Sequence, residues 1–269
     1  MTRRVASVGM AATSILFLLT LLVTPAVQAQ EKLRYSCSSQ VYEAFDKERI
    51  EAFTKATGIE VEVYVAPSAV SLSRLLSGLS DVASVARGGG PQPQKEAGTM
   101  ETPFCRDPLA VFVHARVRVD TITSDQLAEI FSRKITNWKE LGGADEAIML
   151  VVPGRNTAAY ENFRHLAMKR KEIQYDITTH HSTLAIEVVK RFPTAISFIT
   201  QGAIGAAGGV KMLKINGLAP ADKGYPFFQT FTLVTKGKPT GAVKTFVDFT
   251  LSEKGQALIE KRGMTPLSP

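Results

Sequence analysis

The sequence predicts an α/β fold built from two successive α/β units. Between residues 33 and 86, candidate strands and helices alternate in the order β-α-β-α-β, which is typical of a parallel sheet covered by helices. A second alternation of apolar strands and helices fills the middle of the chain, and one strand returns late, near residue 231. The composition agrees, because 45% of the 269 residues are hydrophobic and 21% are charged, as in globular proteins.

The elements of the first unit follow from hydrophobic spacing and from capping residues. Ser38 and Ser39 offer caps for a long helix, whose apolar residues keep helical spacing until Gly58 ends it. Residues 59–65 alternate strictly between apolar and other side chains, which predicts a strand. Ser68 or Ser71 can cap the next helix. The predicted order is strand 33–36, helix 41–57, strand 59–65, helix 72–79, strand 81–86, and a Gly/Pro-rich loop at 88–94.

The second unit begins with residues 109–113, a nearly continuous apolar run of the kind found in buried strands. Ser124 can cap the following helix, and Asp125 suits its first turn because the helix dipole favours an acid there. Residues 106–108 and 224–226 are candidate crossing points between the units. The remaining predicted elements are helix 125–131, strand 149–152, helix 158–168, helix 183–191, strand 195–200, strand 231–235, and helices 241–251 and 253–261.

Residues 1–29 have the pattern of a cleaved secretory signal. A basic start containing Arg3 and Arg4 precedes an apolar run at 15–23, and small residues stand before a cut after Ala29. The alternative is a membrane anchor, but the run is shorter than the roughly 20 residues that span a bilayer. The first cysteine, Cys37, is too far from the run for a lipoprotein cut. We expect a periplasmic or secreted protein.

Charge and residue clusters exclude several classes of function. Cleavage removes Arg3 and Arg4, so the formal charge falls from +7 to +5, which suits an anionic ligand but also an ordinary solvated surface. Because no Lys/Arg run with interleaved aromatic residues appears, nucleic-acid binding is not expected. The adjacent His180 and His181 lack further ligands at metal-binding spacing, so we expect no metal or other cofactor. No catalytic Ser/His/Asp or Cys/His signature is present, so we expect no enzyme.

Residues 122–143, ITSDQLAEIFSRKITNWKELGG, resemble the PstS-like phosphate-binding proteins of ABC importers. Residues 214–220, 235–244 and 251–256 support the resemblance, which runs in order over nearly all of residues 33–267. It implies a type II periplasmic-binding-protein fold, in which two α/β lobes joined by hinge strands close on a ligand cleft. The implied lobes are residues 30–108 with 227–269, and residues 109–226.

The resemblance also implies an anion site made of hydroxyls, helix N-termini and arginine. The serines have the alternative of being simple helix caps, and Arg87 that of being a surface residue. Several family glycines that let backbone amides approach an anion are replaced, for example by Cys37 and Ala158. The implied ligand-binding residues are Ser38, Ser39, Ser68, Arg87, Arg155 and Thr157.

One departure from the family concerns selectivity. Phosphate at neutral pH carries a proton, and a selective site needs an acceptor for it. The family aspartate that accepts this proton is Ala86 here, so we expect weakened phosphate selectivity, with sulfate, molybdate or tungstate competing. Alternatively, Asp107 or Glu161 supplies the acceptor.

The expected function is therefore capture of phosphate or a related oxyanion, with delivery to an ABC permease by a monomeric protein. The alternative is a sensory or structural partner of a membrane receptor with a weakened or altered site. The resemblance places Cys37 after the first strand and Cys105 at the start of the hinge strand. Because export leads to an oxidising compartment, we expect a Cys37–Cys105 disulfide, with two free thiols as the alternative.

Overall fold

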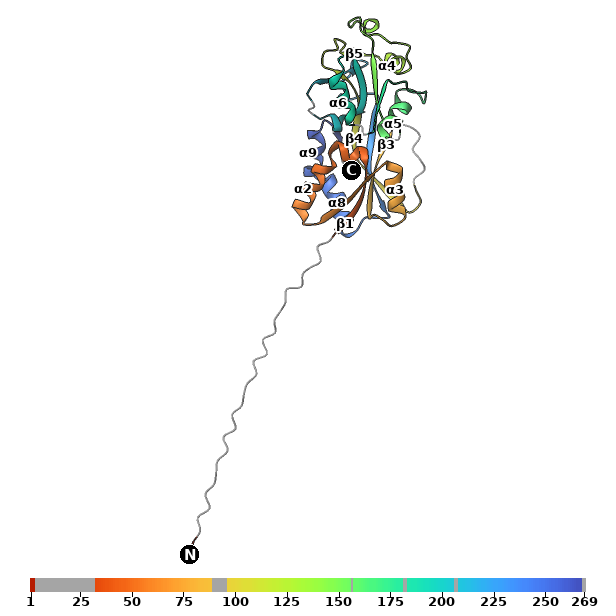
Figure 1. The fold of residues 1–269 in the computed structure, drawn as a ribbon. Coiled ribbons are helices and arrows are strands. Elements are labelled where there is room, and N and C mark those ends of the chain that lie inside the picture. Colours follow the sequence, from red (N-terminus) through yellow and green to blue (C-terminus); the bar gives the residue numbers. More distant parts are fainter. Residues whose placement is uncertain (3–31, 89–95, 156, 181–182, 206–207, 268–269) are drawn as a thin grey trace.

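The computed structural model describes residues 1–2, 32–88, 96–155, 157–180, 183–205 and 208–267 (Figure 1). The predicted signal, residues 1–29, lies outside the described residues except for its first two, and so does most of the predicted loop at 88–94. His181 is also outside them.

The strands are β1 (Lys32–Ser38), β2 (Glu60–Ala66), β3 (Val82–Gly88), β4 (Thr99–His114), β5 (Thr121–Ile122), β6 (Met149–Pro153), β7 (Ile177–Thr179), β8 (Ala195–Thr200), β9 (Val210–Met212), β10 (Lys214–Ile215), β11 (Phe228–Lys236) and β12 (Thr265–Pro266). The helices are α1 (Ser39–Val41), the π-helical η1 (Tyr42–Asp46), α2 (Lys47–Thr57), α3 (Ser68–Leu76), α4 (Ser124–Phe131), the 3-10 helix η2 (Trp138–Leu141), α5 (Ala158–Leu166), α6 (Leu184–Arg191), α7 (Gln201–Ile204), α8 (Gly241–Leu251) and α9 (Glu253–Lys261).

One mixed sheet runs through the molecule. Its order is β2-β1-β3-β11-β4-β8-β6-β7, and β9 and β12 also pair with β4. Strands β1, β2 and β3 are parallel, as predicted for the first unit, whereas β11 and β4 are antiparallel neighbours. The predicted strand at 109–113 is only the second half of β4, because the first half pairs with β11 and the second with β8.

The hydrophobic core is divided between the two ends of this sheet. One cluster takes its buried residues from positions 33–105 and 231–264, and includes Phe45, Phe53 and Phe246. Another takes its residues from positions 109–227, where Phe131, Phe163 and Phe198 pack together. We call these two parts the first and second units. Figure 1 shows the second above the first, with β4 and β11 passing between them.

Most predicted helices are present, and their differences from prediction have local causes. The helix predicted at 41–57 is helical to Gly58, which ends it with a left-handed φ of 74°, but its first part is the π-helical η1. Such a wider turn changes the direction of the side chains that follow it. The predicted Ser124 cap is wrong, since Thr123 caps α4 by accepting from Gln126 N–H.

The predicted Cys37–Cys105 disulfide is wrong, because both cysteines are free thiols and fully buried. Cys37 lies on β1 and Cys105 on β4, with β3 and β11 between them in the sheet. Three strand spacings of about 4.8 Å separate the two backbones by roughly 14 Å. A disulfide needs Cα atoms within about 7 Å.

Thiol counting tests this arrangement. Unfolding the protein without reductant should release two titratable thiols per chain, whereas the native protein should react slowly with a thiol reagent. Burial raises the pKa of both the Cys37 and the Cys105 thiol, so the reactive thiolate is scarce in the folded state. A count near zero after denaturation would contradict the structure.

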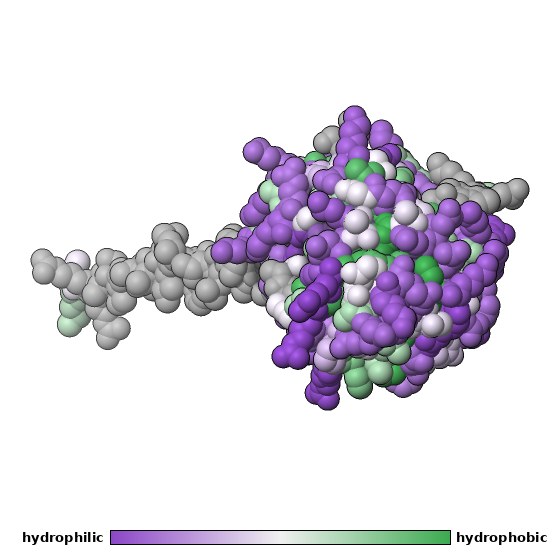
Figure 2. All heavy atoms as spheres, turned by 90° about the horizontal axis from the view of Figure 1, so that it is seen from above, coloured by the Kyte–Doolittle hydropathy of each residue, from purple (hydrophilic) through white to green (hydrophobic). Residues whose placement is uncertain are grey.

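The surface seen from the end of the second unit is mostly hydrophilic, with hydrophobic residues showing between the polar ones (Figure 2). Within the part of the chain that the structure describes, no helix is long and apolar enough to cross a bilayer.

Candidate functional site

The carboxyl ends of β1, β2 and β3 bring the predicted serines together. Ser68 Oγ donates to Ser38 Oγ at 3.1 Å and accepts from the backbone N–H of Ala86 at 3.1 Å. The backbone N–H of Ser38 in turn donates to Ser84 Oγ at 3.2 Å, which adds a serine that sequence reasoning missed. Ser39 is half-buried at the start of α1, beside Ser38. The parallel register of the three strands therefore gathers hydroxyls at one edge of the sheet.

Neither Ser38 nor Ser68 acts as a helix cap. Ser38 occupies the N-cap position of α1 without a side-chain capping bond, and the N-cap of α3 is Pro67. The simple-cap alternative for these two serines is thus wrong. The Ser68 hydroxyl instead bonds to the Ser38 hydroxyl and to the backbone of β3, and the two serines lie where helices α1 and α3 begin.

Arg87 points away from this serine cluster. Its guanidinium forms an ion pair with Glu101 at 2.6 Å, and both side chains are largely buried. Strand β11 lies between β3, which carries Arg87, and β4, which carries Glu101. Arg87 is paired in register with Thr230 of β11, whereas Glu101 is paired with Val234, four residues further along β11. Val234 lies level with Ala83, so the arginine extends back over the sheet and away from the carboxyl end of β3.

Arg155 and Thr157, from the loop between β6 and α5, also have partners within their own unit. Arg155 forms an ion pair with Glu172 at 2.5 Å and lies 5.7 Å from the ring centroid of Tyr175, with 58% of its side chain exposed. Thr157 caps α5 by accepting from Tyr160 N–H at 3.2 Å, and it donates to Gly154 O at 2.7 Å. The structure therefore joins Ser38 and Ser68 but leaves Arg87, Arg155 and Thr157 with other partners.

A residue of α5 that sequence reasoning missed connects the two units. Asn162 Nδ2 donates to Gln229 Oε1 of β11 at 2.5 Å. Its Oδ1 lies against Gly88 at the end of β3, so that a Cβ placed on this glycine would be 2.4 Å away. Asn162 directly precedes the buried Phe163, and only the packing of α5 on β3 and β11 gives its side chain a partner.

Gly88→Ala should therefore disturb the contact between the units. The added methyl displaces the Asn162 side chain and breaks its bond to Gln229, so we expect a several-fold lower affinity for any ligand held between the units. Calorimetry of ligand binding measures the change, with Gly208→Ala as the control, because a Cβ at Gly208 would meet nothing within 4 Å. Equal affinities for the two variants would show that the Gly88 contact plays no part in binding.

Unpartnered polar atoms gather where the units meet. Gln40, Asp107 and Gln229 are each at least 98% buried, yet Gln40 Nε2 and Oε1, Asp107 Oδ2 and Gln229 Nε2 have no protein hydrogen-bond partner among the described residues. The same holds for Thr200 Oγ1 and Gln201 Oε1, at the end of β8 and the start of α7. Buried polar atoms are normally paired, so a ligand or water is expected to meet this group.

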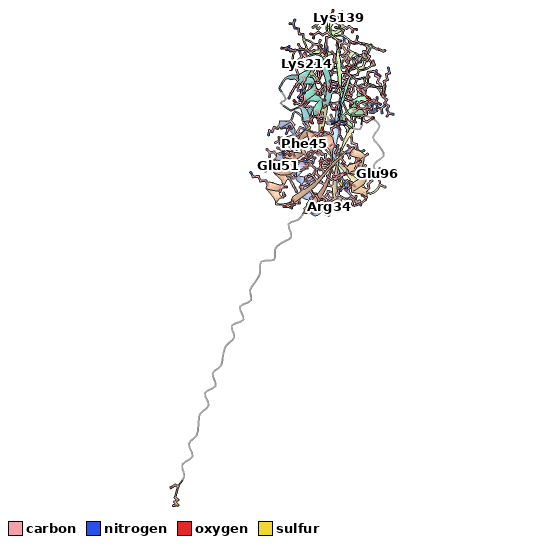
Figure 3. The ribbon with its side chains drawn as sticks, in the orientation of Figure 1. Arg34, Phe45, Glu51, Glu96, Lys139 and Lys214 are labelled. Carbon is pink, nitrogen blue, oxygen red and sulfur yellow. The ribbon has the colours of Figure 1, made fainter. Side chains whose placement is uncertain are left out.

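Two cations beside this junction are paired with one carboxylate. A cavity of 490 Å³ lies beside Gln201, Gly205 and Gly263, and its two cations, Lys261 and Arg262, both contact Glu48, at 3.7 and 2.6 Å. Among the described residues, no cluster of three or more His, Cys, Asp and Glu side chains could hold a metal ion. Arg34 and Lys139 lie at opposite ends of the molecule, far from the junction (Figure 3).

Comparison with known proteins agrees with this architecture. A family model described as a PBP superfamily domain matches residues 23–254. The phosphate-binding protein PstS of Bacillus subtilis (strain 168) is 31% identical over 166 residues, which cover 60% of this chain and 55% of that protein. The chain thus spans about half to two thirds of the length of the first curated relatives it matches.

Solved structures give the same picture over more of the chain. A phosphate ABC transporter substrate-binding protein from Clostridium perfringens, solved with bound phosphate, superposes with a TM-score of 0.75 and 25% identity, covering 88% of this chain and all of that one. An ABC-type phosphate transport receptor from Vibrio cholerae superposes with a TM-score of 0.70 and 23% identity, covering 87% of this chain and 99% of that one. These likenesses confirm the predicted type II periplasmic-binding-protein fold.

Proposed function

Because the chain belongs to the PBP superfamily domain family, we propose that it is an exported solute-binding protein that captures phosphate or a related oxyanion for an ABC importer. The names of its relatives support this ligand class, since the Bacillus subtilis protein is a phosphate-binding protein and the Clostridium perfringens structure contains phosphate. The proposal includes no catalytic step and no cofactor.

The observation that carries the proposal is a pair of serines, Ser38 and Ser68, at the carboxyl ends of β1 and β2. Neither hydroxyl makes a helix-capping hydrogen bond. A dehydrated oxyanion needs several donors, and hydroxyls beside helix N-termini supply them. Ser38 and Ser68 are within hydrogen-bond distance of each other, so one small anion can reach both. Ser39 and the start of α3 add further donors on the same side.

The proposed mechanism is closure of two lobes, residues 30–108 with 227–269 and residues 109–226. The division of the core supports these limits, because one cluster ends at Cys105 and resumes at Phe231, and the other extends from Leu109 to Phe227. Strands β4 and β11 would act as the hinge. Closure would add Arg155 and Thr157 from the loop before α5 to the donors of the first lobe, where Arg87 of β3 is a further proposed contact. All three side chains must first leave their present partners.

The remaining parts of the proposal concern the route of the protein. Residues 1–29 would be removed on export, and the mature monomer would act in the periplasm or outside the cell. Its partner would be an ABC permease, and we propose no interaction with nucleic acid.

A thermal-shift screen of ligand-stripped protein tests the proposal. A ligand that binds only the native state stabilises it by mass action and so raises the melting temperature. At a ligand concentration of 100 times Kd, the free energy of unfolding rises by about 2.7 kcal/mol. We expect phosphate or another tetrahedral oxyanion to raise it and small carboxylates to leave it unchanged. If no oxyanion raises the melting temperature at millimolar concentration, the transport proposal fails.

One observation favours a second candidate, a sensory or structural partner of a membrane receptor. Both arginines that the resemblance implies for the site are paired with glutamates, Arg87 with Glu101 and Arg155 with Glu172. Neither positive charge is free to meet an anion in this arrangement. Permease and ATPase genes beside the gene would favour transport, and their absence would favour this alternative.

A further inference from the structure

The cavity of 490 Å³ lies where the start of α2, the end of α9 and the short helix α7 meet. Helices α2 and α9 lie side by side in the first unit (Figure 1). Sites for small molecules have volumes of about 300–1,000 Å³, so the cavity is large enough for one. Its lining comes from both units: Glu48, Lys261, Arg262 and Gly263 from the first, and Gln201 and Gly205 from the second.

This cavity is separate from the serine cluster. The helical residues from Ser39 to Glu48 span roughly 13 Å, so the serines and the cavity lie at opposite ends of that stretch. Between them, Ala44 packs against Gly202 of α7, since a Cβ on this glycine would lie 2.9 Å from the Ala44 Cβ. Met264 Sδ lies 2.8 Å from the same position. This contact closes the junction between the two places.

The two cations of the cavity retain unused donors. Arg262 uses Nη2 for its 2.6 Å contact with Glu48, and its Nη1 lies 3.5 Å from the position of a Cβ on Gly205, across the junction. Lys261 Nζ lies 3.7 Å from Glu48, which is beyond hydrogen-bond distance. Two cations and one carboxylate leave one positive charge in excess. An anionic group can therefore bind both cations without breaking the pair of Arg262 and Glu48.

Two acceptors in the lining lack a donor. Gln201 is only 9% exposed, and its Oε1 has no hydrogen-bond partner among the described residues. Its amide reaches the other unit, because Nε2 lies 2.8 Å from the position of a Cβ on Gly263. Glu48 Oε2 is buried and also has no hydrogen-bond partner in the described part of the chain. Buried acceptors are normally paired, so a ligand of the cavity is expected to donate to both.

We propose that this cavity is a second binding site, which takes the phosphate monoester of a polyhydroxylated compound such as a sugar phosphate. The phosphate oxygens accept from Lys261 and Arg262, and hydroxyl groups of the ligand donate to Glu48 and Gln201. A neutral sugar lacks the charge, and an ester without hydroxyl groups leaves both acceptors unpaired, so each should bind more weakly. The site does not depend on the proposed function, because none of its residues belongs to the serine cluster.

Calorimetry with glucose 6-phosphate tests the site in the Ser38→Ala, Ser68→Ala double variant, in which binding at the serine cluster is suppressed. We expect glucose 6-phosphate to bind and glucose to bind far more weakly. Adding Lys261→Ala should lower the affinity for glucose 6-phosphate at least about tenfold, because a hydrogen bond from a charged donor is lost. The matched control is Lys254→Ala, which removes an exposed lysine at the other end of α9 and should leave the affinity unchanged.

A second variant, Gln201→Leu, tests the acceptors of the site. Leucine is similar in size to glutamine but offers no oxygen to a ligand hydroxyl. The affinity for glucose 6-phosphate should fall several-fold, whereas that for methyl phosphate, which has the same phosphate group and no sugar hydroxyls, should stay the same. If Gln201→Leu does not fold, the two lysine variants still decide, since the Lys261 side chain is 69% exposed and its removal leaves the packing intact.

Three results would overturn this inference: no binding of glucose 6-phosphate at millimolar concentration, equal affinities of the Lys261→Ala and Lys254→Ala variants, or equal affinities for glucose 6-phosphate and methyl phosphate. None of them affects the proposed function, which depends on inorganic oxyanions at the serine cluster of the unaltered protein. Conversely, a protein that binds no inorganic oxyanion but binds glucose 6-phosphate with loss on Lys261→Ala would refute the proposed function and support this site.

Discussion

Replacing Arg49 by alanine is expected to lower the free energy of unfolding by about 3–5 kcal/mol, because it leaves a buried carboxylate without its cation. Arg49 and Asp46 form an ion pair at 2.6 Å, and neither side chain is exposed. Arg49 also donates to Tyr35 OH at 2.8 Å and to Thr250 Oγ1 at 3.1 Å. Its loss therefore affects β1, η1 and α8 at once.

The surroundings of Arg49 explain why this effect should be large. Its guanidinium lies 4.7 to 5.2 Å from the ring centroids of Phe45, Phe104 and Phe246, so the pair is enclosed by aromatic side chains. Asp46 Oδ2 accepts from Tyr35 OH at 2.6 Å and from the Cys37 thiol at 2.7 Å. Water therefore cannot easily solvate the Asp46 carboxylate once the positive charge of Arg49 has been removed.

Urea denaturation measures this prediction. The midpoint should fall with little change in slope, since the exposed area on unfolding stays nearly the same. Lys244→Ala is the control, because Lys244 pairs with Asp248 on the exposed face of α8, and such pairs contribute about 0.5 kcal/mol or less. Similar midpoints for the two variants would show that the buried pair does not stabilise the first unit.

Replacing both Ser38 and Ser68 by alanine is expected to weaken oxyanion binding by about 100-fold or more. Each hydroxyl would donate to a charged ligand, and hydrogen bonds to charged groups contribute about 1.5–3 kcal/mol each. The protein should remain folded, because neither hydroxyl caps its helix. Calorimetry with the tightest-binding oxyanion measures the loss.

The matched control is Ser73→Ala on α3, where the serine is exposed. It should leave the affinity unchanged. Arg155→Ala gives a useful contrast, since Arg155 is paired with Glu172 in this structure. If Arg155→Ala abolished binding while the double serine variant bound normally, the ligand would lie against the second unit and the serines would be structural.

Local patterns were enough to predict most of the elements. The alternation at 59–65 predicts the strand observed as Glu60–Ala66, and the helices predicted at 241–251 and 253–261 have the observed bounds. Hydrophobic spacing and end signals act over one or two turns or a few strand residues, so they are legible in sequence. The resemblance added the two-lobed arrangement and the serines at the strand ends.

Partners far apart in the chain could not be predicted in this way. The predicted disulfide required Cys37 and Cys105 to be close, but the strand order inserts β3 and β11 between their strands. The candidate Arg87 was aligned with a family residue, yet Glu101 draws it away from the site. A motif shows where a residue stands along the chain, whereas the direction of a long side chain depends on the nearest opposite charge.

The sequence by itself therefore determined the order of strands and helices, the fold class and the hydroxyls at the ends of β1 and β2. Only the tertiary structure decided which of the candidate groups lie together. It engaged both arginines, and it left one Asp107 oxygen without a hydrogen-bond partner among the residues that the structure describes. The physical reason is that secondary structure follows from the preferences of neighbouring residues. Burial and pairing of charges depend instead on which strands become neighbours when the sheet assembles.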